Sequence, residues 1–167
     1  MRLLVLRHGQ AKDAPRGGDD IDRPLSKAGR AAAATLAHVV QRLEPQLVLC
    51  SSALRTRQTL EALELDGPNG VDVSIEPGLY GAEVDQILEH VRGIDDENST
   101  VLVVGHNPGV HQLVIELTGG DRVPSFRPAT LAVVRIDAEH WWEVGTSTGW
   151  IESLHVPDGP SSVRRLR

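Results

Sequence analysis

The sequence alternates short uninterrupted apolar runs with longer segments in which apolar residues recur every three or four positions. Residues 3–6, 47–50 and 101–104 are each apolar throughout. Such runs are typical of strands that are buried on both faces, as in a parallel sheet. Residues 71–75 form a weaker run and predict a further short strand.

The segments between these runs show helical periodicity. Ser26 is a candidate N-cap ahead of a periodic segment that stops before Pro45, which predicts one helix there. Residues 54–65 predict a second helix, and periodic segments that begin at Val84 and after Pro108 predict two more. This alternation predicts an α/β fold, a three-layer α/β/α sandwich around a mostly parallel central sheet.

The last third of the chain departs from this alternation. Residues 130–136 and 140–145, joined at 137–139, predict a late antiparallel hairpin. The chain then becomes rich in Pro, Gly and Ser and ends in Arg-Arg-Leu-Arg, so we expect residues 158–167 to form a flexible tail. We therefore expect one domain over residues 1–157.

Composition narrows the class of protein. The 167 residues suffice for one domain with a buried core, and 40% of them are apolar. A net charge of −6 argues against a nucleic-acid or anionic-membrane surface, and no apolar run approaches the length of a membrane span. The single cysteine, Cys50, has no intramolecular disulfide partner, which fits a reducing compartment. We expect a cytoplasmic protein without nucleic-acid or membrane partners, and the sequence leaves its oligomeric state open.

Polar residues of the same kinds follow each of the three strong strands. Arg7, His8 and Gly9 end the first strand, Arg55 comes shortly after the second, and His106 follows the third. The carboxyl ends of parallel strands lie at one edge of a sheet, and binding sites form in the crevice there. We therefore expect two histidines and two arginines to converge at that edge.

Two arginines and two histidines together are suited to phosphoryl transfer. Guanidinium groups bind phosphoryl oxygens in forked geometry and disfavour the protonated form of a nearby imidazole. A neutral imidazole is a competent nucleophile that can carry a phosphoryl group covalently. A second histidine can donate a hydrogen bond to the phosphoryl oxygens as charge shifts in the transition state. The N–H of Gly9 is a candidate for orienting His8 or for binding the ligand.

Three motifs, in matching order, carry a resemblance to a known family. Arg7-His8-Gly9 resembles the Arg-His-Gly signature of the histidine phosphatase superfamily, whose fold is the phosphoglycerate-mutase-like one. The segment Ser-Ser-Ala-Leu-Arg-Thr-Arg-Gln-Thr at 51–59 looks like its second arginine motif. Gly-His-Asn-Pro at 105–108 looks like its second histidine motif. Each motif alone is short, and their combination makes the resemblance specific.

Within that superfamily the likeness points to the short bacterial SixA-type phosphohistidine phosphatases, whose loop-to-helix segment is similar to residues 22–26. Larger relatives carry insertions that cover the pocket. The roles that the resemblance implies are phosphate acceptor for His8, phosphate binding for Arg7 and Arg55, and support of the transfer for His106. No metal or other cofactor is expected, because the arginine pair supplies the positive charge.

The motifs do not identify the proton donor. Many relatives carry an acidic residue after the third strand, and Glu83 lies in roughly that region, so it is the candidate catalytic acid. The alternative is that Glu83 is an ordinary acidic residue in the first turn of a helix, where the helix dipole favours it. Cys50 precedes Arg55 by four intervening residues, one fewer than in cysteine phosphatases, so a thiol nucleophile is a weak alternative.

Three functions stay open at this point. The first is a phosphohistidine phosphatase that acts on a phosphorylated protein through a covalent intermediate on His8. The second is a general phosphomonoesterase for small molecules, whose alcohol leaving group calls for a general acid. The third is a catalytically silent module that binds phosphorylated groups, and the presence of both histidines and both arginines counts against it.

Overall fold

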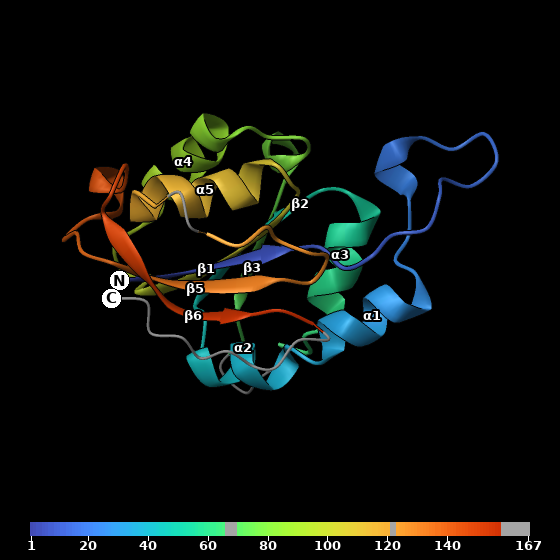
Figure 1. Cartoon of the computed structure of the whole chain (residues 1–167), viewed down its shortest axis with the longest axis horizontal. Coiled ribbons are helices and arrows are strands. Elements are labelled where there is room, and N and C mark those ends of the chain that lie inside the picture. The colour runs from blue at the N-terminus through green and yellow to red at the C-terminus, as the bar shows by residue number, and fades with distance from the viewer. Residues whose placement is uncertain (66–69, 121–122, 158–167) are drawn as a thin grey trace.

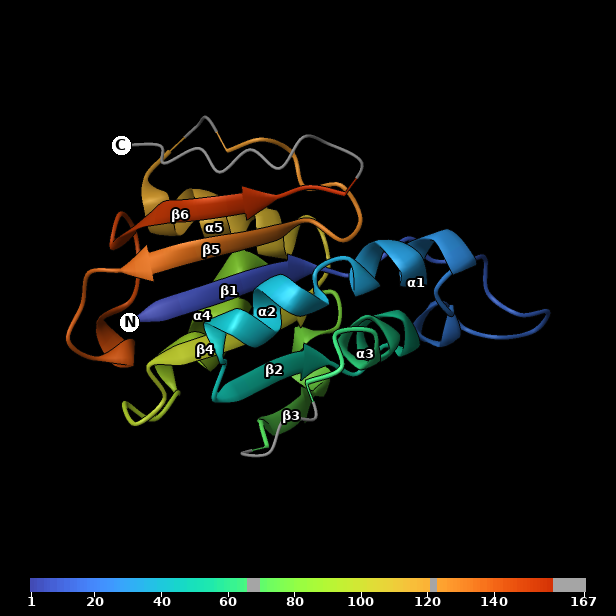
Figure 2. The ribbon, with the colours of Figure 1, turned by 90° about the horizontal axis from the view of Figure 1, so that it is seen from below.

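The computed structural model describes residues 1–65, 70–120 and 123–157, and in these ranges the chain forms a six-stranded sheet between helices (Figure 1). The strands are β1 (Arg2–Arg7), β2 (Leu47–Ser51), β3 (Asp72–Glu76), β4 (Thr100–Gly105), β5 (Leu131–Ile136) and β6 (Gly149–His155). Their spatial order is β3-β2-β4-β1-β5-β6, as Figure 2 shows for the labelled strands. Strands β1 to β4 are parallel, while β5 and β6 are added in antiparallel pairing.

Helices cover both faces of this sheet. They are α1 (Lys27–Ala34), α2 (Ala37–Leu43), α3 (Leu54–Glu61), α4 (Val84–Arg92) and α5 (Gly109–Thr118), with short 3-10 turns η1 (Asp20–Asp22), η2 (Pro77–Leu79) and η3 (Trp141–Glu143). Figure 1 shows α4 and α5 on one side of the sheet and α2 on the other. The predicted α/β sandwich with a mostly parallel central sheet is confirmed.

Successive residues of the central strand β1 face two different cores. Leu3 and Val5 pack with residues of α4 and α5, and Leu4 and Leu6 pack with residues of α2. Side chains alternate between the two faces of a strand, so a strand between two helical layers must be apolar at every position. All four side chains are fully buried, and each contributes roughly 1.5–3 kcal/mol by leaving water.

The helix predicted after Ser26 is divided in two. The N-cap is confirmed, because the Ser26 hydroxyl accepts a hydrogen bond from the Gly29 N–H at 2.9 Å. The helix breaks at Thr35, whose hydroxyl donates to the Ala32 carbonyl oxygen at 2.6 Å. The break separates α1, which packs against α3, from α2, which places Val40 in the core of the sheet. A periodicity count along one straight helix does not reveal such a bend.

The predicted late hairpin is wrong in its second strand. β5 pairs with β6, which begins at Gly149, whereas residues 140–145 contain the turn η3. Trp141 in η3 is fully buried, and its indole N–H donates to the Asn98 carbonyl oxygen at 2.7 Å. The buried side chains of Trp141 and Val144 thus account for the apolar character that resembled a strand.

Two parts of the sequence prediction lie outside the described residues. They are the expected flexible tail at 158–167 and the link between the predicted helix at 54–65 and the predicted strand at 71–75, of which residues 66–69 are not described. The described residues include no helix that is both long and apolar enough to cross a membrane.

Candidate active site

The strand-end histidines lie side by side. His8 follows the last residue of β1, and His106 follows the last residue of the neighbouring parallel strand β4. Their ring centroids are 5.1 Å apart, with the planes inclined at 61°. Because β1 and β4 are in parallel register, Arg7 is paired with Gly105, and the two following residues meet beyond the same edge of the sheet.

His8 is held as a neutral imidazole with one free nitrogen. Its Nδ1 lies 2.7 Å from the carbonyl oxygen of Gly9. A carbonyl oxygen can only accept, so Nδ1 carries the proton and Nε2 keeps its lone pair. Burial lowers the pKa of His8, the charges of Arg55 and Arg7 act in the same direction, and the Gly9 hydrogen bond opposes them. The resulting pKa is about 4. At neutral pH the ring is therefore uncharged and can act as a nucleophile.

His106 is also neutral, but its nitrogens have different surroundings. Its Nε2 lies 2.7 Å from the hydroxyl oxygen of Ser51, the last residue of β2. Its Nδ1 is buried and has no hydrogen-bond partner among the described residues. Burial, together with the neighbouring His8 and Arg55, lowers the pKa of His106 to about 3. The free nitrogen of His106 is therefore Nδ1, whereas that of His8 is Nε2.

Arg7 is fixed by the loop that precedes β5. Its Nη1 donates to the carbonyl oxygen of Phe126 at 2.6 Å, and the side-chain amide of Asn107 donates to the same oxygen at 3.1 Å. The Phe126 ring is buried and stacks at a tilt on His111, which anchors the loop. The Nε of Arg7 is buried without a hydrogen-bond partner among the described residues.

Arg55 stands in the first turn of α3 and is bound by a residue that the sequence prediction did not include. Its Nη1 donates to the backbone oxygen of Asp20 at 2.7 Å, and its Nη2 donates to Oδ2 of the same residue at 3.0 Å. Asp20 belongs to η1, in the segment that joins β1 to α1. Arg57, two residues further along α3, is exposed, as expected for a residue that points to another side of the helix.

Tyr80 joins this group from the segment after β3. Its hydroxyl donates to Asp20 Oδ2 at 2.8 Å, and its ring lies edge-on to the His106 ring with centroids 5.7 Å apart. The hydrogen bond from Tyr80, followed by that from Arg23, lowers the pKa of Asp20 to about 2, so this carboxylate is ionised at neutral pH. Nothing in the local sequence of Asp20 or Tyr80 marks them, because only the folding of two separate loops brings them together.

Gly9 has a structural role, and this role requires a residue without a side chain. Its N–H donates to the hydroxyl of Thr59 at 3.0 Å, and its carbonyl oxygen binds His8. A Cβ atom on Gly9 would lie 2.5 Å from the carbonyl oxygen of Gly29 in α1, and a Cβ atom on Gly29 would clash with the backbone of Gln10. These two glycines therefore let α1 approach the segment that follows His8.

Glu83 and Cys50 are the two other candidates that the sequence offers. Glu83 is the N-cap residue of α4, its side chain is exposed, and its N–H donates to Gln86 Oε1 at 3.0 Å. No hydrogen bond joins Glu83 to either histidine among the described residues. Cys50 is fully buried within β2, where burial raises the pKa of its thiol to about 12. A buried thiol of this kind is not a nucleophile at neutral pH.

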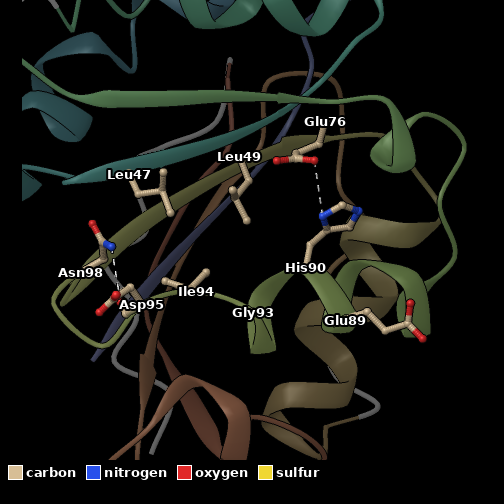
Figure 3. Close-up of a pocket in the computed structure, with 9 residues that line it drawn as sticks. All are labelled: Leu47, Leu49, Glu76, Glu89, His90, Gly93, Ile94, Asp95 and Asn98. Carbon is tan, nitrogen blue, oxygen red and sulfur yellow. Dashed lines mark hydrogen bonds and ion pairs between the residues drawn. The ribbon is translucent and has the colours of Figure 1, made fainter.

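A cavity of about 490 Å³ lies on another side of the molecule, between the edge of the sheet and α4 (Figure 3). Leu47 and Leu49 of β2 line it, and an ion pair of 3.7 Å joins Glu76 and His90 at one end. None of the strand-end histidines and arginines lines this cavity. Within the described ranges, no three His, Cys, Asp or Glu side chains are grouped so as to hold a metal ion.

The profile of the histidine phosphatase superfamily (branch 1) matches residues 3–87. The chain is 32% identical over 142 residues to the phosphohistidine phosphatase SixA of Escherichia coli strain K12, a match that covers 82% of this chain and 86% of that protein. The structure superposes on a protein histidine phosphatase SixA in complex with tungstate with a TM-score of 0.77 at 29% identity, over 94% of this chain and 97% of that one.

A protein from Nakamurella multipartitia that is assigned as the phosphohistidine phosphatase SixA gives a TM-score of 0.79 at 31% identity, over 95% of this chain and 96% of that one. The matched profile includes His8 and Arg55, and the similarity to the Escherichia coli protein extends over most of the chain. The six-stranded, mostly parallel sheet agrees with this likeness. The chain is therefore a phosphatase that belongs to the histidine phosphatase superfamily.

Proposed function

We propose that this phosphatase removes phosphate from phosphohistidine side chains of proteins and carries the phosphoryl group transiently on His8. The observation that carries the proposal is the hydrogen bond of 2.7 Å between His8 Nδ1 and the Gly9 carbonyl oxygen. It leaves the lone pair of Nε2 free for attack on phosphorus. The neighbouring His106 ring, 5.1 Å away, lies where it can donate to the transferred group.

The proposed reaction has two steps. In the first, His8 Nε2 attacks phosphorus, a P–N bond to His8 forms, and the P–N bond to the substrate imidazole breaks. The substrate leaves as a neutral imidazole, because the electron pair of the broken bond returns to the leaving nitrogen and the proton taken up beforehand is on the other nitrogen of the ring. In the second, a water oxygen attacks the same phosphorus, the bond to His8 breaks, and the water protons remain with the released phosphate and the solvent. Arg7 and Arg55 offset the negative charge of the phosphoryl oxygens in both steps.

The lack of a protonated carboxyl group beside the two histidines, among the described residues, favours phosphohistidine as the substrate. An alcohol leaves well only if an acid protonates it, whereas a phosphoimidazole takes up a proton near neutral pH by itself. Asp20, with a pKa of about 2, is ionised and has no proton to give. Among the described residues no carboxyl group is hydrogen-bonded to His8 or His106. The similar SixA protein binds tungstate, a tetrahedral oxyanion with the shape of phosphate, which supports an oxyanion site of this kind.

The test is a panel of substrates assayed side by side in the presence of EDTA. We expect phosphohistidine peptides to be hydrolysed with a kcat/KM at least ~10-fold above that of small phosphomonoesters, because the site favours the better leaving group. Ready hydrolysis of the monoesters with the phosphohistidine peptides left intact contradicts the proposal. Activity that EDTA does not reduce agrees with charge stabilisation by arginine in place of a metal.

The second candidate is a phosphomonoesterase for small molecules, and the position of Glu83 beside the segment that carries Tyr80 is the observation in its favour. Glu83→Gln separates the two functions. If Glu83 protonates an alcohol, this variant loses most of its activity on monoesters and little on phosphohistidine. If Glu83 serves only as the N-cap of α4, activity on both substrates stays within ~2-fold of the unchanged enzyme.

Transfer of radiolabelled phosphate from a substrate to the protein tests for the covalent step. We expect acid-labile label on the unchanged protein and none on His8→Ala, because a phosphoramidate bond breaks readily in acid. An unchanged protein that takes up no label and turns over none of several good phosphate donors fits the third possibility, a silent phosphate-binding module.

A further inference from the structure

We propose that Ser51 is a positioning residue, whose hydroxyl group donates to His106 Nε2 and thereby holds His106 as the tautomer with its proton on Nδ1. Only this tautomer can donate a hydrogen bond from the free nitrogen to a phosphoryl oxygen. The use of that donor rests on the proposed function, whereas the position of the proton does not.

The geometry fixes Ser51 firmly against His106. Ser51 is the last residue of β2 and is fully buried, and its Oγ lies 2.7 Å from His106 Nε2. Its backbone oxygen accepts a hydrogen bond of 2.7 Å from the hydroxyl of Thr56, which ties the strand end to the first turn of α3. Tyr80 lies edge-on to the His106 ring. The ring is therefore enclosed, and the contact with Ser51 is part of the packed structure.

Two arrangements of the protons are possible, and they differ in the polar groups that they leave without a partner. If Nε2 carried the proton and donated to Ser51, the hydroxyl proton of Ser51 would have no acceptor among the described residues. The lone pair of His106 Nδ1 would also be without a donor. If Ser51 donates instead, its proton is satisfied, and the Nδ1–H is the one donor without a partner. Buried donors without acceptors are costly, so the second arrangement is favoured.

A bound phosphoryl group increases the preference for a proton on Nδ1 of His106. With the proton on Nδ1, a phosphoryl oxygen accepts from it and satisfies the last free donor of the pair. With the proton on Nε2, the Nδ1 lone pair would face an anionic oxygen and repel it. The two histidines are thus held in matching tautomers by different kinds of partner. The Gly9 carbonyl leaves a lone pair free on His8, and the Ser51 hydroxyl leaves a donor free on His106.

Long-range nitrogen–proton NMR correlation of the imidazole rings tests the proposal in the unchanged protein. The spectrum distinguishes a protonated nitrogen from an unprotonated one in each ring, and His106→Gln identifies the signals of His106. We expect the protonated nitrogen of His106 to be Nδ1 near pH 7. A protonated Nε2 in the unchanged protein overturns the proposal. This result needs no substrate and no assay.

Ser51→Ala provides the second measurement, with Ser52→Ala as the matched control. Ser52 is the next residue, and its side chain makes no hydrogen bond among the described residues. In Ser51→Ala we expect a mixed population of His106 tautomers and a kcat about 10-fold lower with little change in KM, because the donor is lost for part of the molecules. Ser51→Thr keeps a hydroxyl group and is expected to restore the Nδ1 proton. A single unchanged His106 tautomer in Ser51→Ala contradicts the assignment.

The two measurements separate this inference from the proposed function. If the unchanged protein shows the Nδ1 proton but hydrolyses no phosphohistidine, the proposed substrate is wrong and the tautomer assignment holds. If the protein is active and the proton is on Nε2, the assignment is wrong and the phosphatase proposal holds.

Discussion

The two ends of the sheet both carry histidines, in opposite electrostatic states. At the carboxyl end of the parallel strands, burial and nearby arginines lower the pKa values of His8 and His106 to about 4 and about 3. At the other end, His140 is exposed, and its Nδ1 lies 2.7 Å from Oδ2 of Asp96, which raises the pKa of His140. The His140 ring stacks on the exposed Trp142.

This difference shows that the surroundings, and not the side chain, decide what a histidine does. A carboxylate neighbour favours the imidazolium form and makes a surface ion pair, which is weak in water. Burial against arginines favours the neutral form and leaves a nitrogen lone pair available for chemistry. Among the described residues, burial, positive charge and free imidazole nitrogens come together at the carboxyl end of the sheet and not at the opposite end.

The largest expected effect comes from removing the nucleophile at the carboxyl end. His8→Ala is expected to reduce kcat/KM for phosphohistidine peptides on the order of 10⁴-fold, because no other group takes over the attack on phosphorus. The matched control is His140→Ala at the other end, which is expected to leave kcat/KM unchanged. A substantial loss of activity in His140→Ala, with the fold intact by circular dichroism, contradicts the separation of the two ends.

The next effect concerns the arginines of α3. Arg55→Lys keeps the charge but loses the planar fork that binds oxygen atoms, so we expect kcat/KM to fall about 100-fold. Arg57→Lys is the control, since Arg57 lies in the same helix and is exposed. Steady-state kinetics of both variants checks the prediction. Equal losses in the two variants would show that general positive charge, and not the position of Arg55, supports the reaction.

The pH dependence of stability should have opposite signs at the two ends. The unfolded chain protonates His8 near pH 6.5, but the folded protein does so only near pH 4, so acidification between these values favours the unfolded state. Over this range we expect the unchanged protein to lose more free energy of unfolding than the His8→Asn variant does, by a difference on the order of 2 kcal/mol. Urea unfolding of both proteins from pH 7 to pH 4 measures it. Parallel pH curves for the two proteins would show that His8 titrates normally.

The smallest expected effect is at the opposite end. The raised pKa of His140 means that its ion pair with Asp96 stabilises the fold below pH 6.5 and that this contribution is lost as the pH rises through the raised pKa. Asp96→Asn should return the pKa of His140 toward its ordinary value and leave phosphatase activity unchanged. NMR titration of the His140 ring checks the shift, and a pKa that does not fall in Asp96→Asn would assign it to another neighbour.

The sequence was sufficient to predict the strands that have a strong pattern of apolar residues. β1, β2 and β4 each contain four consecutive apolar residues because two helical layers cover them, so their runs could be recognised directly. β6 escaped recognition because only Ile151 and Leu154 of its residues are buried. The strand predicted in its place, residues 140–145, owed its apolar character to the buried Trp141 and Val144. An edge strand with few buried positions leaves little periodic signal.

The residues of the candidate site likewise divide into those that the sequence could predict and those that it could not. His8, Arg55 and His106 could be placed at one edge because each follows a strong strand. Asp20 and Tyr80 could not, since their contact joins two loops that are 60 residues apart in sequence. Ser51 was visible within a motif, but its relation to His106 depends on a distance across two strands that no local pattern encodes.

The close approach of Gly9 and Gly29 has a consequence for the interpretation of natural variants. Gly29 lies on a helix, touches neither arginine of the site and has no functional group, so a change to alanine there would be classed as harmless on chemical grounds. The added methyl group would clash with the backbone of Gln10 and displace the carbonyl oxygen that orients His8. A gene copy carrying that change would keep all of its motifs and still encode a defective phosphatase.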